Sequence, residues 1–315
     1  MSRRSALVAA EEEHASPAPP QPRTQRRAEQ LTGIAFVAPA VVVIVGLGLF
    51  PAAWAGLLAL QKWNGFKDPR FVGTDNFERM GRDADLVSAA WHTLLYTALF
   101  MPTSVVGGLL LAVALNRRIR LMGLYRTAIF VPYVASAAVT GLLANFVFNP
   151  EVGVVNNVLR VVGLPQQGWL EDPGQAILVL VVMSLWGQLG FVTVVYLAAL
   201  QDVDTACMEA AEVDGANAVQ RFWHITVPQV APVTAFVVIW QTIQCIQLFD
   251  LVYTTTRGGP IGATTTLVYY LWQQAFRQLN FGYGSAIAWV LFIVTMAMTL
   301  VLVAIQRRRG GEQPA

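Results

Sequence analysis

Long apolar stretches constrain this chain more than any other feature of its sequence. We expect them at roughly 34–60, 87–115, 127–148, 176–200, 229–256 and 284–305. A helix that crosses the hydrocarbon core of a bilayer needs about 20 mostly apolar residues, so each stretch is long enough to cross. Continuous runs of this length exclude the alternating pattern of barrel strands, and helices are the remaining way to pair the backbone in lipid. The sequence therefore predicts an all-α polytopic membrane protein with six transmembrane helices.

Composition favours the same setting. Hydrophobic residues make up 55% of the chain and charged residues only 13%, against roughly 25% charged residues in typical soluble domains. A soluble fold would have too little polar surface to cover this much apolar material.

The regions outside the spans are short. The first residues contain an apolar run that is too short for a signal peptide, and a proline-rich stretch follows it. We expect a disordered cytoplasmic tail at 1–30, a six-helix transmembrane domain at 31–306 and a cytoplasmic tail at 307–315. The first span then serves as an uncleaved insertion signal.

Arginines near the span ends indicate the orientation, because positive residues accumulate on the cytoplasmic side. If six helices are threaded in order, one side carries almost all of them and includes both termini and the loop at 201–228. The loop at 61–86 is an exception, because it mixes basic with acidic residues. We therefore expect both termini in the cytoplasm. The arginines on the cytoplasmic side are Arg23, Arg26, Arg27, Arg117, Arg118, Arg120, Arg126, Arg221, Arg307, Arg308 and Arg309.

The polar segment between the fourth and fifth spans is typical of two short helices joined by a turn. Asp202 or Asp204 can cap the first helix, and Asn217 can cap the second. Gly215 can take the positive φ that ends a helix. Pro228 suits the first turn of the next long helix.

Two faces of this segment are suited to contact with another protein. Ala206, Ala210 and Val213 fall at helical spacing and form a narrow face of small side chains. Phe222 and Ile225 lie on one side of the second helix. An ordinary interfacial loop without a partner is the alternative, and the full spacing through the following proline makes it the weaker interpretation.

Motifs for chemistry are missing from the sequence. It contains no G-x-x-x-x-G-K-[ST] phosphate loop, no H-E-x-x-H and no G-x-S-x-G. Its histidines are scattered, and Cys207 and Cys245 lie at different depths. Asp250 is the only acidic residue expected well inside a span. Ion-coupled carriers commonly need more ionisable groups at membrane depth, so this absence weakens the interpretation of the chain as such a carrier. We expect no enzymatic activity, no metal site and no cofactor in this chain.

Glutamines inside the spans are candidates for a polar pathway. Gln241, Gln244 and Gln247 lie in the fifth span, and Gln188 lies near Phe191 in the fourth. Uncharged amides can bond hydroxyl groups, and aromatic faces can stack on a sugar ring. The alternative is that these amides join one helix to another. The residues alone leave both interpretations open.

The segment Glu209-Ala210-Ala211-Glu212-Val213-Asp214-Gly215-Ala216, continuing to Ile225-Thr226-Val227-Pro228, resembles the EAA loop of permease subunits of ABC importers. That pattern is EAA, a glycine three residues on, nine further residues and then I-x-L-P; Val227 replaces the leucine. Other segments resemble carbohydrate importers of the maltose and glycerol-3-phosphate type, although Arg257 stands where glycine or serine is usual. These segments are 36–40, 71–77, 126–132, 249–253, 258–266, 275–276 and 281–286.

The resemblance implies half of a channel of the type I ABC importer permease fold. Such a chain pairs with a second homologous permease, sits on two copies of a cytoplasmic ATPase that bind ATP and Mg²⁺, and receives its solute from an extracytoplasmic solute-binding protein. The solute would be a sugar or a related polyol, with or without a phosphate group. Docking to the ATPase is assigned to Glu209, Ala210, Ala211, Asp214, Gly215, Phe222, Ile225 and Pro228, and the substrate path to Gln188, Phe191, Gln241, Gln244, Cys245 and Gln247.

Two other classes of protein remain as alternatives. A self-contained secondary transporter or channel would move solute without ATP. A membrane-anchored scaffold would recruit cytosolic proteins through 201–228 and move nothing. The importer permease would need three other proteins.

Overall fold

The structure is a computed structural model that describes residues 23–116 and 121–310. It divides into two units, Met1–Trp54 and Ala55–Ala315. In the first unit, α2 (Arg23–Val43) leads through a π-helix, η1 (Ile44–Leu49), into α3 (Phe50–Ala59), which ends in the second unit. Helix therefore begins at Arg23, within the range expected to be a disordered tail, whereas residues 1–22 of that expected tail lie outside the described residues.

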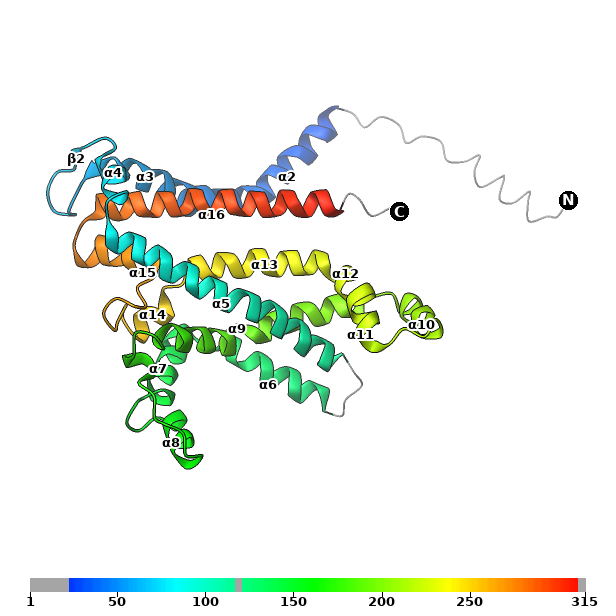
Figure 1. Cartoon of the computed structure of the whole chain (residues 1–315). Helices are drawn as coiled ribbons and strands as arrows, with labels where there is room; N and C mark the ends of the chain where they lie inside the picture. Colours follow the sequence, from blue (N-terminus) through cyan, green and yellow to red (C-terminus); the bar gives the residue numbers. More distant parts are fainter. Residues whose placement is uncertain (1–22, 117–120, 311–315) are drawn as a thin grey trace. The chain divides into compact units, whose positions relative to one another are not determined.

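The second unit is almost entirely helical (Figure 1). The all-α expectation holds except for an antiparallel ribbon of two very short strands, β1 (Gln61–Lys62) and β2 (Arg70–Phe71). The first half contains α4 (Asp75–Met80), α5 (Ala84–Leu115), α6 (Met122–Val134), α7 (Ala137–Val147), α8 (Val154–Val161), η2 (Trp169–Glu171) and α9 (Ala176–Gln201). The second half contains α10 (Thr205–Val213), α11 (Ala218–Arg221), η3 (Phe222–Thr226), α12 (Val227–Gln229), α13 (Ala231–Ile246), α14 (Asp250–Thr254), α15 (Leu267–Trp272), η4 (Gln273–Arg277) and α16 (Phe281–Gly310).

Four described helices are long and apolar enough to cross a membrane unbroken: 32–59, 84–115, 176–201 and 281–306. Two more spans exist only if bent pairs are counted as one each. The expected span at 127–148 is α6 and α7, which meet at 98°, and the expected helix at 229–256 is broken on both sides of α13. The last helix continues to Gly310, into the range expected to be a tail, and 311–315 lie outside the described residues.

Local sequence explains where these spans break. Pro132 lies near the end of α6, and Ser136 caps α7 by accepting a hydrogen bond from the amide of Val139 at 3.4 Å. At the other break, α12 and α13 differ by 67° around Val230. Helix α6 ends at Val134, two residues after Pro132, and the chain then turns sharply into α7. Pro102, in contrast, lies within the unbroken α5.

Helix α9 packs against α5, α6, α7 and α13. Small residues permit the close approach: a side chain at Gly190 would overlap the backbone carbonyl of Ile129 on α6, and one at Gly108 on α5 would overlap Val192. The window of α9 that could span a membrane is 44% buried, whereas that of α16 is 11% buried. α9 is therefore the central helix of the second unit, and α16 presents most of its apolar surface outward.

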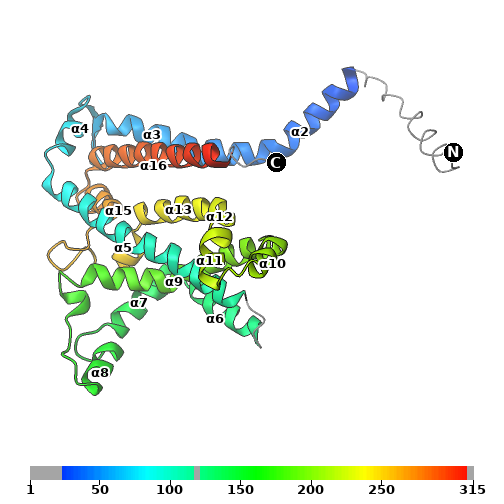
Figure 2. The ribbon, with the colours of Figure 1, turned by 45° about the vertical axis from the view of Figure 1, so that its right-hand side comes forward.

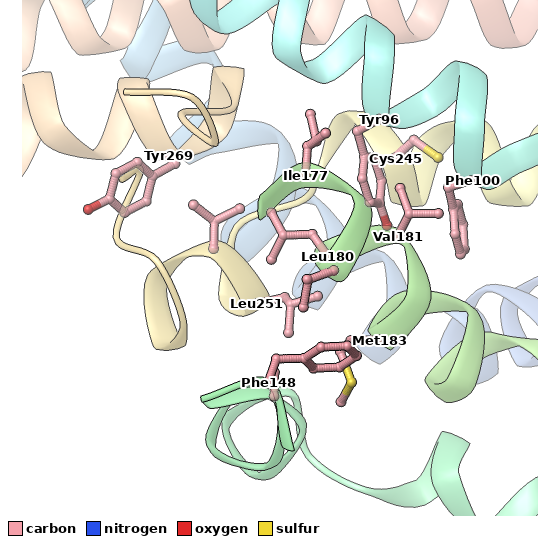
Figure 3. Packing of buried hydrophobic residues seen from close by; sticks show 13 residues of the cluster. Tyr96, Phe100, Phe148, Ile177, Leu180, Val181, Met183, Cys245, Leu251 and Tyr269 are labelled. Atoms are coloured by element: carbon pink, nitrogen blue, oxygen red, sulfur yellow. The ribbon is translucent and has the colours of Figure 1, made fainter. Parts of the chain in front are cut away.

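Buried side chains form a continuous apolar cluster around the start of α9. Figure 3 shows Tyr96 and Phe100 from α5, Met183 from α9 and Leu251 from α14 approaching one another from different elements. The rings of Tyr96 and Phe100 stack with centroids 5.4 Å apart. This cluster fixes the start of α9 against α5, α7 and α14.

A group of polar side chains, which we call the polar clasp, lies at the end of the second unit that is opposite α10 (Figure 1). Asp83 caps α5 and also accepts hydrogen bonds from the hydroxyls of Tyr270 and Tyr283. The guanidinium of Arg79 lies 4.0 Å from the centre of the Tyr283 ring. Burial raises the pKa of Asp83, but the hydrogen bonds from Tyr283, Tyr270 and the Leu86 amide, together with Arg79, bring that pKa below its ordinary value. The clasp joins the start of α5 to α15 and α16.

We predict that Gly190→Ala destabilises the protein, because the added methyl group would force α9 away from the α6 backbone. Overpacking of this kind costs about 1–3 kcal/mol. Gly187→Ala, on the same helix, has no atom within 4 Å of the added carbon, and should stabilise the protein by at most about 1 kcal/mol through helix propensity. The midpoint of thermal unfolding in detergent measures both. Equal midpoints for the two variants would contradict the close packing of α6 on α9.

Candidate functional site

Residues 201–228, which we call the elbow, form two short helical segments joined by a turn. The side chain of Asp204 caps α10 by accepting a hydrogen bond from the amide of Ala206 at 2.8 Å, so the expectation of a cap at Asp202 or Asp204 is confirmed for Asp204. Hydrogen bonds from Ala206 and from the Cys207 thiol lower the pKa of Asp204, and the same carboxylate raises the pKa of Cys207. The cap fixes where the first segment begins.

Gly215 ends the first segment as expected. Its φ is +81°, in the left-handed region. The amide of Gly215 donates to the carbonyl of Glu212 at 3.1 Å, and the amide of Ala216 donates to that of Ala211 at 2.9 Å. These two bonds form a Schellman motif, which satisfies carbonyls that the helix end would leave free.

Asn217 begins the second segment, as expected. Its side chain accepts from the amide of Gln220 at 2.9 Å, and its own amide donates to the Gln220 side chain at 2.8 Å. This reciprocal arrangement is a capping box. Pro228 lies in the first turn of α12, but α12 ends at Gln229, so Pro232 and not Pro228 opens the long helix α13.

An ion pair that the sequence patterns did not indicate joins the two segments. Arg221 donates from its guanidinium to the carboxylate of Glu212. A pocket of about 360 Å³ lies beside this pair, and Gly215 and Ile225 contribute to its lining. Glu212 and Arg221 are nine residues apart across a turn, so helical spacing gave no signal for their contact.

Most of the residues assigned to docking are accessible on the elbow. Glu209, Ala210, Asp214, Gly215 and Pro228 are exposed, whereas Ala211, Phe222 and Ile225 are half-buried. Val213, on the expected face of small side chains, is 88% exposed. The elbow thus offers apolar and acidic side chains at the end of the second unit where α5 and α16 end (Figure 2).

A second feature is a cavity of about 200 Å³, which we call the hollow. Two breaks in helical structure border it: the α6–α7 break contributes Ala135, next to Tyr133 in the last turn of α6, and the α13–α14 break contributes Gln247 and Phe249. Irregular backbone at membrane depth is tolerated where it lines a cavity. The full lining is Tyr96, Phe100, Pro132, Tyr133, Ala135, Ala137, Thr140, Met183, Ser184, Gly187, Gln188, Gln244, Gln247, Leu248, Phe249, Asp250 and Leu251.

Three of the residues expected in a substrate path meet at this hollow. Gln188 comes from α9, Gln244 from α13 and Gln247 from the break that follows α13. The Oε1 atom of Gln188 is buried and has no hydrogen-bond partner among the described residues. Amide groups from three segments therefore converge on one cavity.

Gln241 and Cys245 lie elsewhere. Gln241 is fully buried, and its Nε2 donates to the Oγ of Ser104 on α5 at 2.7 Å. Cys245 is buried in the apolar cluster beside Tyr96 (Figure 3). Neither lines the hollow in this structure. The geometry of Gln241 matches the alternative interpretation, in which an amide joins one helix to another.

Phe191 lies in a row of aromatic rings beside the hollow. Its ring stacks on that of Tyr133 with centroids 5.1 Å apart and lies 5.6 Å from that of Trp240. Tyr133 lines the hollow, so Phe191 supports the lining from behind.

Sequence reasoning missed several lining residues. Tyr96, Tyr133 and Ser184 gave no signal, because their positions resemble ordinary apolar or small-residue packing until the helix breaks are known. Asp250 was noticed as an acidic residue in a span but was not assigned to the path; the structure places it in the lining at the first position of α14. Within the described ranges no three potential ligands come together to hold a metal ion.

Residues 88–309 match the sequence model of the family described as binding-protein-dependent transport system inner membrane component. The lactose transport system permease protein LacF of Rhizobium radiobacter is 33% identical over 290 residues, which cover 90% of this chain and 97% of that protein. The sn-glycerol-3-phosphate transport system permease protein UgpA of Agrobacterium fabrum is 33% identical over 84% of this chain and 90% of its own length.

A solved structure shares the fold. A chain of a bacterial ABC transporter involved in the import of the acidic polysaccharide alginate superposes with a TM-score of 0.80, at 22% identity, over 91% of this chain and 99% of that one.

Two glutamines of α13 provide a matched test of the hollow. Ser104→Ala should leave the buried Gln241 amide unpaired and cost about 1–3 kcal/mol of stability, whereas Ser104→Ala with Gln241→Leu should restore most of it. We predict that this double variant keeps solute uptake and that Gln244→Leu loses it with little change in stability. Thermal unfolding and uptake into vesicles measure the two effects. If the double variant is stable but loses uptake while Gln244→Leu keeps it, then Gln241 and not Gln244 belongs to the path.

Proposed function

Because this chain belongs to the family of binding-protein-dependent transport system inner membrane components, we propose that it forms half of the translocation pathway for a sugar or related polyol. As a member of that family it is a multi-pass inner membrane permease subunit of an ABC importer, and ATP hydrolysis belongs to a separate subunit. The solute, the pathway residues and the coupling surface are the parts that we propose.

The structure of the elbow is the main support for this function. Its two capped segments, the Schellman turn at Gly215 and the Glu212–Arg221 ion pair make it a compact element with its own hydrogen bonds. We propose that it docks on the cytoplasmic ATPase through Glu209, Ala210, Ala211, Asp214, Gly215, Phe222, Ile225 and Pro228. Nucleotide-driven closure of the ATPase would move the elbow, and the attached helices would then change access to the path.

The partners follow from this proposal. A second homologous permease would complete the pathway, two copies of the ATPase would bind ATP and Mg²⁺, and a periplasmic binding protein would deliver the solute. An alginate transporter of the same fold has been solved in complex with a pentasaccharide-bound periplasmic protein. The hollow of about 200 Å³ is smaller than the roughly 300–1,000 Å³ of typical ligand sites, as expected if a second chain supplies the facing wall.

The proposed orientation places both termini in the cytoplasm. The elbow, the start of α6 with Arg126 and the end of α16 lie at the same end of the second unit (Figure 1). Arginines accumulate on the cytoplasmic side. The proposed ATPase is also cytoplasmic, so the elbow must face that side to contact it.

A carbohydrate solute is supported by the relatives and by the lining. LacF is named for lactose and UgpA for sn-glycerol-3-phosphate. The amides of Gln188, Gln244 and Gln247 can bond hydroxyl groups, and the rings of Tyr133 and Phe249 offer faces for an apolar side of a sugar. We therefore propose these three glutamines as path residues, with Phe191 as their support.

The proposal predicts which proteins accompany the chain. We expect gentle extraction from the native membrane through a C-terminal tag to recover an ATPase, a second permease and a solute-binding protein, identified by mass spectrometry. A secondary transporter would be recovered alone and would move solute in vesicles without ATP. A scaffold would be recovered with other cytosolic proteins and would move nothing. Either result would overturn the proposed pathway and its coupling.

Substitutions at Gly215 test whether the elbow couples the chain to the ATPase. Its positive φ disfavours a branched side chain, although no atom lies within 4 Å of the position of an added Cβ. We predict that Gly215→Val abolishes ATP-driven uptake while the chain stays in the membrane at its usual level. Gly215→Asn is the matched control and should retain most uptake, because asparagine tolerates the left-handed conformation. Normal uptake by Gly215→Val would contradict the proposal that the elbow couples uptake to the ATPase.

A further inference from the structure

The charge of the hollow bears on which solutes it accepts. Among the described residues of its lining, Asp250 is the only one with a charged side chain. It is exposed and occupies the first position of α14. A single acidic group without a basic neighbour in the lining gives the cavity a negative field.

The helix ends at the hollow do not reverse that sign. Each of the two breaks supplies one helix end and one helix start: α6 ends and α7 begins at the first, and α13 ends and α14 begins at the second. A helix start carries roughly +0.5 of a unit charge and a helix end roughly −0.5. These two contributions offset each other, so the full charge of Asp250 decides the sign.

Hydrogen-bonding capacity points in the same direction. The carboxylate of Asp250 is exposed, lines the hollow and only accepts hydrogen bonds. A solute group that bonds this carboxylate must donate hydrogen bonds. Hydroxyl groups donate, whereas the oxygens of ionised phosphate, sulfonate and carboxylate groups only accept.

Resting on the proposed function, we propose that the hollow takes a neutral, hydroxyl-rich solute and that Asp250 is the residue that rejects phosphorylated, sulfonated and carboxylated ones. Asp250 accepts hydrogen bonds from solute hydroxyls, and the amides of Gln244 and Gln247 bond the remaining groups. Asp250 thereby restricts the solutes that the hollow accepts to unphosphorylated sugars or polyols.

Charged thiol reagents measure the field directly. Gln247 is exposed, lines the hollow and lies three residues before Asp250. In a Cys207→Ser background, Gln247→Cys is treated in native membranes with methyl methanethiosulfonate and with its cationic trimethylammonium-ethyl and anionic sulfonatoethyl analogues. We expect Asp250→Asn to lower the ratio of cationic to anionic reaction rates by about tenfold, the effect of one unit charge roughly 6 Å away in a water-like medium.

Two controls isolate Asp250. Asp250→Glu should keep the wild-type ratio, and Asp85→Asn, which removes an exposed charge outside the lining, should leave the ratio unchanged. The buried Cys245 remains in every variant, and its reaction is measured in the parent that lacks the new cysteine. The proposal is overturned if Asp250→Asn leaves the ratio unchanged, if the anionic reagent reacts faster in wild type, or if the neutral reagent does not reach position 247.

The solute itself gives an independent outcome. We expect the compound bound to the co-purified solute-binding protein to be neutral by mass spectrometry, and a phosphorylated, sulfonated or acidic compound would overturn the inference. If no ATPase or binding protein accompanies the chain, the proposed function fails, but the reagent ratio still tests the field of the hollow. The two failures are therefore distinguishable.

Discussion

The pairing of backbone polar groups at membrane depth is the constraint on which this structure depends. Intact helices satisfy it within themselves, and lipid-exposed irregular backbone is not tolerated. In this chain, helical structure bends sharply at Val230 and stops at two breaks, 135–136 and 247–249. Both breaks line the hollow, where polar side chains and a solute can replace lipid as neighbours. The polar cavity and the broken helices are therefore one feature, and Gln247 and Asp250 of its lining lie where helical structure stops and resumes.

Helix α9 connects this feature to the elbow. It lines the hollow through Ser184 and Gln188, packs its backbone closely on α6 at Gly190, and ends at Gln201, where the elbow begins. Close packing of this kind resists small deformations, because protein interiors have little free volume. A movement at one end of α9 is thus passed along the helix more readily than it is absorbed within it.

Sequence patterns predicted the elements that depend on local chemistry. The long apolar runs, the αL position at Gly215 and the cap at Asn217 each follow from a few neighbouring residues. The breaks did not follow, because the surrounding stretches are apolar enough to be taken as continuous spans. A proline did not mark a break by itself, since Pro102 lies inside the unbroken α5 and Pro132 lies beside a break. Nor could spacing separate Gln241 from Gln244: they differ through Ser104, a partner 137 residues from Gln241. The place of Asp250 in the lining likewise could not be predicted without knowing that α13 ends before it.

The elbow is inserted between two helices that both reach the hollow. Helix α9 leads into the elbow, α12 begins within the elbow, and α13 follows it. The amide of Asp204 donates to the side chain of Gln229 at 3.0 Å and closes the base of the elbow. A force on the elbow therefore acts on both the α9 wall, with Gln188, and the α13 wall, with Gln244. A ligand at the elbow shifts the state of the hollow only if its contacts differ between states. Since the internal bonds of the elbow are local, such a difference must arise in how the elbow tilts relative to α9 and α13, and not in how it folds.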